Sequence, residues 1–326
     1  MRSRTARTTE PSRRRRLGGR RGEALAFYGF VSPWLLGTAL LTVFPVGYAV
    51  YLSFTAWDGV APFKPWVGLD NYREVLTSAD TMSSLSKTLL LVAIVVPTTI
   101  VGSLVLAVLL NERVRGRTVF RTLIYIPAIV PPVAASLIWK VAFDQNSGAV
   151  NRFLRMLGGT AVSWLTGSHA FVVLVVVLLW GIGAGIIINL AALQTVPAEQ
   201  LEAVKLDGGG AFTAFRHVTL PVISPVLLFQ TVLVTITTLQ TFVPVLLLSP
   251  MSDSGISNVY TNIPNANRVY MVDVYSQFFA YGRYGYGSAM LTVFFLVIVA
   301  MTVMIFKLAG RTVFYAVDPN AAAKEG

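Results

Sequence analysis

Residues 88–111 read TLLLVAIVVPTTIVGSLVLAVLLN, a run that contains no charged side chain. A helix of about 20 apolar residues spans the roughly 30 Å hydrocarbon core of a bilayer. A helix is required there because its backbone groups bond to one another where no water is present. The run therefore predicts a transmembrane helix, and it argues against a water-soluble fold for this part of the chain.

Five further runs have the same apolar character. They lie at 26–54, 119–142, 170–193, 222–248 and 285–306. Of the 326 residues, 55% are hydrophobic and only 13% are charged, whereas a soluble domain carries about a quarter charged residues. The sequence predicts an all-α polytopic membrane protein with six transmembrane helices.

The first 25 residues are basic, with Arg13 to Arg16 followed by Arg20 and Arg21. We reject a signal peptide, including a twin-arginine signal, because the apolar run that follows has 29 residues and no small-x-small cleavage site closes it. We interpret residues 1–25 as a cytosolic anchor without fixed structure. We expect no nucleic-acid partner for it.

Basic residues are distributed unevenly among the segments that connect the spans. If the N-terminus is cytosolic, 18 of the 26 Lys and Arg residues lie on the inner side, which agrees with the positive-inside rule. Six spans return the C-terminal tail, residues 310–326, to the cytosol. The membrane domain is predicted at 26–309.

The chain lacks the side chains that power or catalyse reactions. The middle of each predicted span has none of the charged or imidazole groups that ion-coupled transporters use. The sequence has no G-x-x-x-x-G-K-[ST] phosphate loop, no Cys, and no acid–base or metal-binding constellation. We expect no catalytic site, no metal and no bound cofactor, which argues against a secondary transporter and against a polytopic transferase. Work done by this chain would have to come from a partner.

Residues 194–221 read QTVPAEQLEAVKLDGGGAFTAFRHVTLP, about twice the length that connects two helices. Pro197 favours a first helical turn, and the glycines from Gly208 stop a helix. A second short helix is expected from Ala211 until Pro221 opens the fifth span, so the loop predicts a cytosolic helix-turn-helix. Its apolar face would comprise Leu201, Val204 and Leu206. Docking on lipid is the alternative, but acidic residues facing an anionic membrane would be unfavourable.

This loop resembles the EAA motif of the permease subunits of bacterial ATP-binding cassette importers, E-A-A-x-x-x-G followed by I-x-L-P. The matching residues are Glu202, Ala203, Gly208, Leu220 and Pro221. Val204 and Val218 replace the second Ala and the Ile, and both keep size and apolarity close. The resemblance implies that the first short helix inserts into a cleft of a separate ATPase subunit, which binds ATP and Mg²⁺. The ATPase-docking residues would be Glu199, Glu202, Ala203, Asp207, Gly208, Leu220 and Pro221.

Other segments resemble the carbohydrate-uptake branch of these permeases. They are 67–72 (VGLDNY), 120–127, Ile138 with Trp139, Gly148 with Asn151, and 275–289. The resemblance implies a multi-pass permease of the bacterial cell membrane that carries a sugar or oligosaccharide. Its implied partners are a second, related permease in a heterodimer, two ATPase subunits, an extracytoplasmic solute-binding protein and membrane lipid. A permease for a non-sugar solute, such as glycerol 3-phosphate or an amino acid, is the alternative.

A sugar needs hydrogen-bonding groups and a flat apolar face, so polar and indole side chains within the spans are the candidates for its path. These candidates are Trp139, Trp180, Asn189, Thr235, Thr238 and Gln240. The Thr and Trp candidates have plainer explanations. A Thr in a span often bonds the carbonyl four residues earlier, and Trp commonly lies at the membrane interface.

Overall fold

The structure is a computed structural model that describes residues 16–112, 116–250 and 263–310. These residues form helices, with one isolated bridge between Thr55 and Trp66 and no longer strand among them. The chain divides into two compact units, one ending at Leu52 and the other beginning at Ser53. The predicted all-α fold is confirmed.

The first unit is a run of helix. It comprises α1 (Arg16–Thr38), the π-helical segment η2 (Ala39–Val43) and α2 (Phe44–Leu52). The second unit comprises α3 (Asp70–Thr77), α4 (Ala79–Asn111), α5 (Arg117–Ile129), α6 (Pro132–Ala142), α7 (Ala149–Met156), α8 (His169–Trp180), α9 (Gly183–Leu193), α10 (Ala198–Leu206), α11 (Ala211–Ala214), η3 (Phe215–Thr219), α12 (Leu220–Leu239), α13 (Val243–Leu248), η5 (Asn265–Asn267), α14 (Tyr270–Phe279) and α15 (Tyr284–Ala309).

Among the described residues, six segments are long and apolar enough to cross a membrane when each bent pair of helices counts as one span. Four are single helices, at Ala24–Leu52, Ala79–Asn111, Ala211–Leu239 and Tyr284–Ala309. Two are bent pairs, Thr118–Ile129 with Pro132–Ala142 and His169–Trp180 with Gly183–Leu193. The chain is therefore polytopic, as the hydropathy predicts, although two of its spans are not continuous helices.

The third span is broken at two consecutive prolines. We expected one helix over 119–142, but α5 and α6 meet at an angle of 98°. Pro131 and Pro132 supply no backbone N–H, and their rings exclude a continuing helix. Val130 is accordingly extended, with φ −67° and ψ 126°. The fourth span bends by 41° at Gly181 and Ile182, between α8 and α9.

The fifth span begins earlier and ends earlier than predicted. We expected a short helix from Ala211, a break at Pro221, and a span over 222–248. In the structure one helix runs from Ala211 to Leu239, and 243–248 form the separate helix α13. The second helix of the predicted helix-turn-helix is therefore the first part of the fifth span.

A π-helical segment lets this helix continue past Pro221, the first of its two prolines. The carbonyl four residues before Pro221 belongs to His217, which lies in the middle of η3. A proline ring clashes with that carbonyl in a regular α-helix, and the wider π turn relieves the clash. Leu220 N–H accordingly bonds Phe215 O. The same relation holds in the first unit, where η2 precedes Pro45.

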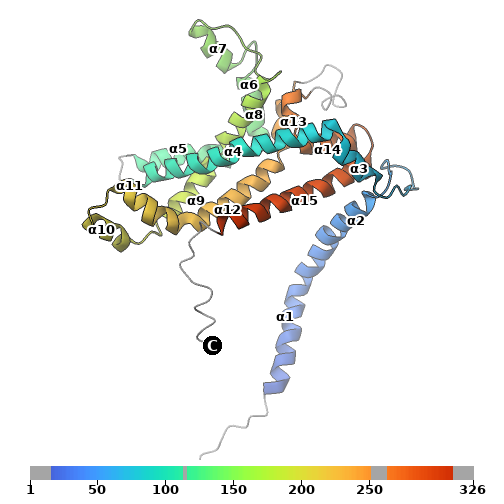
Figure 1. The fold of residues 1–326 in the computed structure, drawn as a ribbon, viewed down its shortest axis with the longest axis horizontal. Helices are drawn as coiled ribbons and strands as arrows, with labels where there is room; N and C mark the ends of the chain where they lie inside the picture. Colours follow the sequence, from blue (N-terminus) through green and yellow to red (C-terminus); the bar gives the residue numbers. More distant parts are fainter. Residues whose placement is uncertain (1–15, 113–115, 251–262, 311–326) are drawn as a thin grey trace, which may run out of the picture. The chain divides into compact units, whose positions relative to one another are not determined.

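Helices α4, α9 and α12 contact one another, and α12 also contacts α15. In Figure 1, α4, α12 and α15 run alongside each other, with α10 at one end of this group and α3 at the other. Three clusters of buried apolar residues lie between the helices. One of them joins α4, α9 and the first half of α12 through Ala107, Leu190 and Ile223.

Much of the two predicted tails, residues 1–15 and 311–326, lies outside the described residues. We expected no fixed structure up to residue 25, but the described chain is helical from Arg16, where α1 begins. Extending an existing helix costs far less than nucleating a new one. The first span can therefore extend its helix into the basic segment.

Candidate functional site

Helix α10 is defined at both ends by its sequence. Pro197 is its extended N-terminal cap, and Glu199 lies in its first turn, where a negative charge is favourable near the helix N-terminus. At the other end Gly208 has φ +80°. Gly208 N–H bonds Lys205 O at 3.1 Å, and Gly209 N–H bonds Val204 O at 2.8 Å. This pair of bonds is a Schellman motif, which requires a left-handed residue at the position of Gly208.

Most of the surface of α10 is exposed in the described chain. None of its residues is buried, and the predicted docking residues Glu199, Glu202, Ala203, Asp207 and Gly208 are all exposed. Leu201 and Val204 are half-buried, as expected for the apolar face. Leu206 is not on that face and is 89% exposed, because five residues of helix rotate it by about 140° from Leu201.

The other two predicted docking residues lie away from α10. Leu220 and Pro221 are half-buried at the start of α12. They line a hollow of about 610 Å³ between α12 and the end of α15, to which Arg216, Ile305 and Leu308 also contribute. The structure therefore brings five of the seven predicted docking residues together on one short helix and its end.

Three hollows adjoin one another where the helices break. The largest, about 630 Å³, includes Pro132, Gln240 and Thr241. The second, about 210 Å³, includes Gly181 and Thr241. The third, about 220 Å³, includes Pro132 and Gly181. All three share Leu178. The breaks of the third, fourth and fifth spans therefore line one hollowed region. Non-helical backbone within a span is tolerated where it lines a cavity.

The lining of this region is apolar with a few hydroxyl and amide groups. Its polar side chains are Thr99, Thr237, Thr238, Gln240 and Thr241. No charged side chain lines any of the three hollows. The region can therefore hold a neutral solute that forms hydrogen bonds, whereas a charged solute would lose hydration there without a compensating partner.

The predicted solute-path residues fall into two groups. Trp180, Thr238 and Gln240 line the hollows. The other three do not. The Trp139 ring packs edge-on against Trp180 at 5.9 Å, and Thr235 Oγ1 donates to Thr231 O at 2.7 Å, the plainer alternative considered for it. Asn189 is buried and donates to Ser103 Oγ at 2.9 Å.

Sequence reasoning did not single out several residues of this region. Thr237 and Thr241 line the hollows beside Thr238. Their spacing of four residues in the sequence was a usable signal, although Thr241 lies beyond the end of α12. Gln230 donates to the same Ser103 hydroxyl as Asn189, at 3.2 Å. Nothing in the sequence pairs Ser103 with Gln230, because 127 residues separate them.

The residues Gly148 and Asn151 organise a loop outside the spans. Asn151 Nδ2 donates to Val162 O at 2.9 Å, and its Oδ1 accepts from Trp164 Nε1 at 2.9 Å. A Cβ at Gly148 would lie 2.4 Å from Asp144 O. Hydrogen bonds from Ser147 and the Asn146 backbone lower the pKa of the Asp144 carboxyl. This segment is therefore a hydrogen-bonded scaffold.

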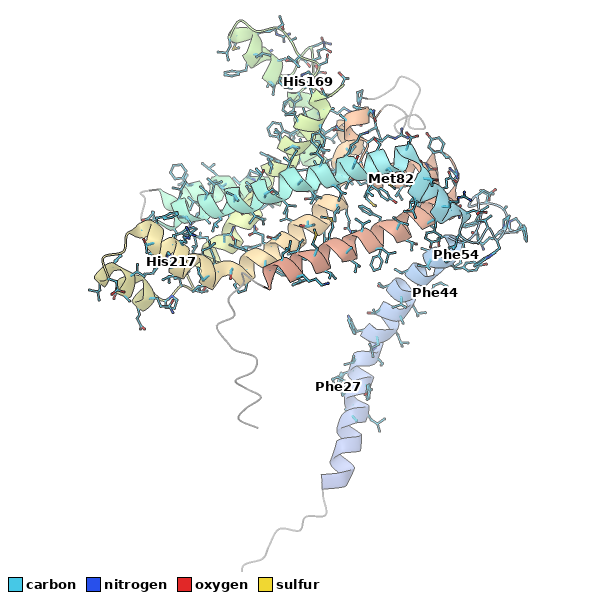
Figure 2. All side chains as sticks on the ribbon, viewed as in Figure 1. Phe27, Phe44, Phe54, Met82, His169 and His217 are labelled. Carbon is cyan, nitrogen blue, oxygen red and sulfur yellow. The ribbon has the colours of Figure 1, made fainter. Side chains whose placement is uncertain are left out.

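The two histidines lie apart in Figure 2, His169 at the start of α8 and His217 on the helix that follows α10. His217 Nδ1 lies 3.1 Å from Thr213 O. Within the described ranges, no group of three or more His, Asp or Glu side chains is arranged to hold a metal ion.

The profile of one protein family, the binding-protein-dependent transport system inner membrane component, matches residues 99–319. This is more than half of the chain, and it includes α10 and every helix break around the hollows. The chain belongs to this family.

Individual members of the family and one solved structure agree with the assignment. The permease is 31% identical over 299 residues to the probable ABC transporter permease protein YesP of Bacillus subtilis, covering 90% of this chain and 94% of YesP. It is 29% identical over 287 residues to the trehalose/maltose transport system permease protein MalF of Thermococcus litoralis, covering 87% and 94% of the two chains.

A bacterial alginate ABC transporter, solved in complex with an alginate pentasaccharide-bound periplasmic protein, contains a chain of the same fold. The TM-score is 0.78 at 18% identity, covering 92% of this permease and 100% of that chain. The likeness establishes the fold of the membrane domain. The permease is thus a multi-pass inner membrane component of a binding-protein-dependent transport system.

Proposed function

We propose that this permease is the transmembrane subunit of an ATP-driven importer that carries a neutral sugar or oligosaccharide. The named relative MalF of Thermococcus litoralis is a trehalose/maltose permease, and the hollowed region has hydroxyl and amide groups but no charged side chain in its lining. A neutral sugar forms hydrogen bonds and stacks on apolar surface, so it matches this lining.

The exposed helix α10 is the observation that supports a separate ATPase as the source of energy for transport. It lies between α9 and the helix that begins at Ala211, and both of these continue toward the hollowed region. Its acidic residues have no ion pair within the described ranges. A basic cleft on an ATPase subunit would supply the partner charges, and motion of α10 would then reach both spans.

The proposed complex contains a second, related permease, two ATPase subunits that bind ATP and Mg²⁺, and an extracytoplasmic solute-binding protein. The N- and C-terminal tails and α10 face the cytosol in this arrangement. Binding of ATP biases the equilibrium between an outward-open and an inward-open state, because a ligand shifts an equilibrium only through its different affinity for the two states. Solute released by the binding protein enters when the path opens outward.

Charged solutes are the weaker alternatives. A glycerol 3-phosphate or amino-acid permease would share the α10 loop, but the solute would carry a charge into a hollow without a counter-charge. Burying an uncompensated charge is strongly unfavourable. The uncharged lining therefore favours a neutral sugar over both.

The proposal is tested by reversing one charge on α10. In Glu202→Lys the exposed carboxylate becomes a cation that repels a basic cleft, so co-purification of the ATPase subunits should fall at least about tenfold. Glu112→Lys is the matched control, because Glu112 is also exposed but directly follows α4. It makes the same change of charge outside α10, at the same end of the helix group (Figure 1).

Both variants should remain in the membrane at the level of the unmodified chain, because neither residue is buried. Equal recovery of ATPase with Glu202→Lys and Glu112→Lys would show that α10 is not the docking element.

A further inference from the structure

Three buried polar side chains meet between α4, α9 and α12. Ser103, Asn189 and Gln230 are 0%, 0% and 2% exposed. Asn189 Nδ2 and Gln230 Nε2 both donate to Ser103 Oγ, at 2.9 and 3.2 Å. Ser103 Oγ in turn donates to Ile100 O at 3.1 Å. We call this set the polar junction.

The Ser103 hydroxyl forms all the hydrogen bonds that it can, whereas the two amide groups do not. A hydroxyl group has one proton to donate and two lone pairs that accept, and all three are committed in the junction. Asn189 Oδ1 and Gln230 Oε1 are buried and have no hydrogen-bond partner among the described residues. Buried carbonyl oxygens without a donor cost free energy, so each is an available acceptor.

The polar junction adjoins the hollow of about 210 Å³ that contains Gly181 and Thr241, on its α10 side. Thr99 and Val234 line that hollow, and Ser103 and Gln230 are one helical turn further along the same faces of α4 and α12. On α9, Asn189 is two turns beyond Ile182. In each of the three helices, the step from the hollow to the polar junction leads toward α10. Beyond the junction Ala107, Leu193 and Ile223 close the space with apolar packing.

Helix α9 leaves space for the polar junction at Gly185. A Cβ at Gly185 would lie 2.2 Å from Gln230 Nε2 and 3.1 Å from the Ser103 Cβ. Only a residue without a side chain allows the Gln230 amide to reach Ser103 at this crossing of helices. The junction is therefore a built arrangement of three helices.

We propose that the polar junction is a hydroxyl-binding subsite at the floor of the solute path. As the path opens toward α10, hydroxyl groups of the solute donate to Asn189 Oδ1 and Gln230 Oε1, while the N–H groups of both amides keep their bonds to Ser103 Oγ. This inference rests on the proposed function, because it requires a solute with hydroxyl groups. In this proposal, two amide oxygens accept the hydrogen bonds that hold the solute at the floor of the path.

The test uses near-isosteric apolar variants, Asn189→Leu and Gln230→Met, in the complete transporter reconstituted in proteoliposomes. The probes are radiolabelled neutral sugars that include maltose and trehalose. Each variant should lower the maximal uptake rate about tenfold, the effect of losing one buried hydrogen bond in transit. ATP hydrolysis stimulated by the loaded binding protein should be unchanged, because solute arrival precedes use of the floor.

The thermal midpoint of the purified complex separates a binding role from a structural one. Each apolar variant removes one unpartnered buried oxygen, which is favourable, and one amide donor to Ser103 Oγ, which is unfavourable. Because Ser103 keeps its other two bonds, the midpoint should stay close to that of the unmodified complex. Thr292→Val is the control, since its hydroxyl bonds its own helix at Ser288 O, and its uptake should be unchanged.

Unchanged uptake in both junction variants would overturn the subsite. Loss of uptake together with a lowered midpoint and reduced ATP hydrolysis would also overturn it, because the junction would then serve only to hold the helices together. Failure of the proposed function looks different. The unmodified complex would then accumulate none of the sugars, and the subsite would fall with it.

Discussion

Gly208 adopts a backbone conformation that side-chain-bearing residues accept only with strain. Its φ is +80°, and it ends α10 through the two bonds of the Schellman motif. No atom lies within 4 Å of the position that a Cβ would occupy. A substitution there strains the backbone without creating a side-chain clash. Its effect on capture of the ATPase measures how much docking depends on the direction of the chain after α10.

We predict that Gly208→Ala weakens capture of the ATPase several-fold, because about 1 kcal/mol of backbone strain in the left-handed region disfavours the observed end of α10. The measurement is the yield of ATPase that co-purifies with the tagged permease. Gly210→Ala is the matched control, since Gly210 has φ −81° and equally open surroundings. Equal yields from the two variants would contradict a docking role for the geometry of α10.

Single residues were predictable where their chemistry is local. The stop at Gly208 and the inward direction of Leu201 and Val204 follow from spacing along one helix. The plain explanation of Thr235, a bond within its own helix, was also available from sequence. The pairing of Ser103 with Gln230 was not, because it depends on how α4 and α12 cross.

At the scale of elements, prolines account for the break of the third span, whereas the fourth span bends at Gly181 and Ile182, where there is no proline. Consecutive Pro131 and Pro132 break the third span, and a proline pair is a recognisable breaker in sequence. Pro221, by contrast, stands within the continuous helix that begins at Ala211. Sequence does not distinguish these outcomes, because a π-helical segment that absorbs a proline depends on the packing around it. The existence of each span was predictable, and its continuity was not.

We predict that the double substitution Pro131→Ala and Pro132→Ala straightens the third span and lowers transport. The chain has no Cys, so spin labels at Val119→Cys and Val141→Cys would occupy the only thiols, at positions 62% and 70% exposed. The Cα atoms of these residues should lie about 22 Å apart across the bend and about 33 Å apart in a straight helix. Pulsed electron paramagnetic resonance measures this change.

Pro127→Ala is the control for this experiment, since Pro127 lies inside α5 and not at the break. Its label separation should match that of the unmodified chain. If the double variant keeps the short separation, contacts with neighbouring helices and not the prolines determine the bend.

At the scale of the whole molecule, composition and the distribution of charge predict the class of protein. Uncharged apolar runs indicate spans, and the lack of intramembrane charges and of a phosphate loop in the sequence is the basis for predicting that a partner supplies the energy. The hollowed region was beyond sequence reasoning, because it forms only where the breaks of three separate spans meet. The candidates Thr238 and Gln240 lie there, but their neighbours come from other helices.

The central claim is that this permease is passive and that an ATPase moves it through α10. The most direct measurement is accumulation of a radiolabelled neutral sugar in proteoliposomes, with the binding protein on one side and ATP on the side of α10. We predict accumulation against a gradient when the ATPase subunits are present and none when they are omitted or when ATP is withheld. Accumulation driven by the purified permease alone would contradict the account.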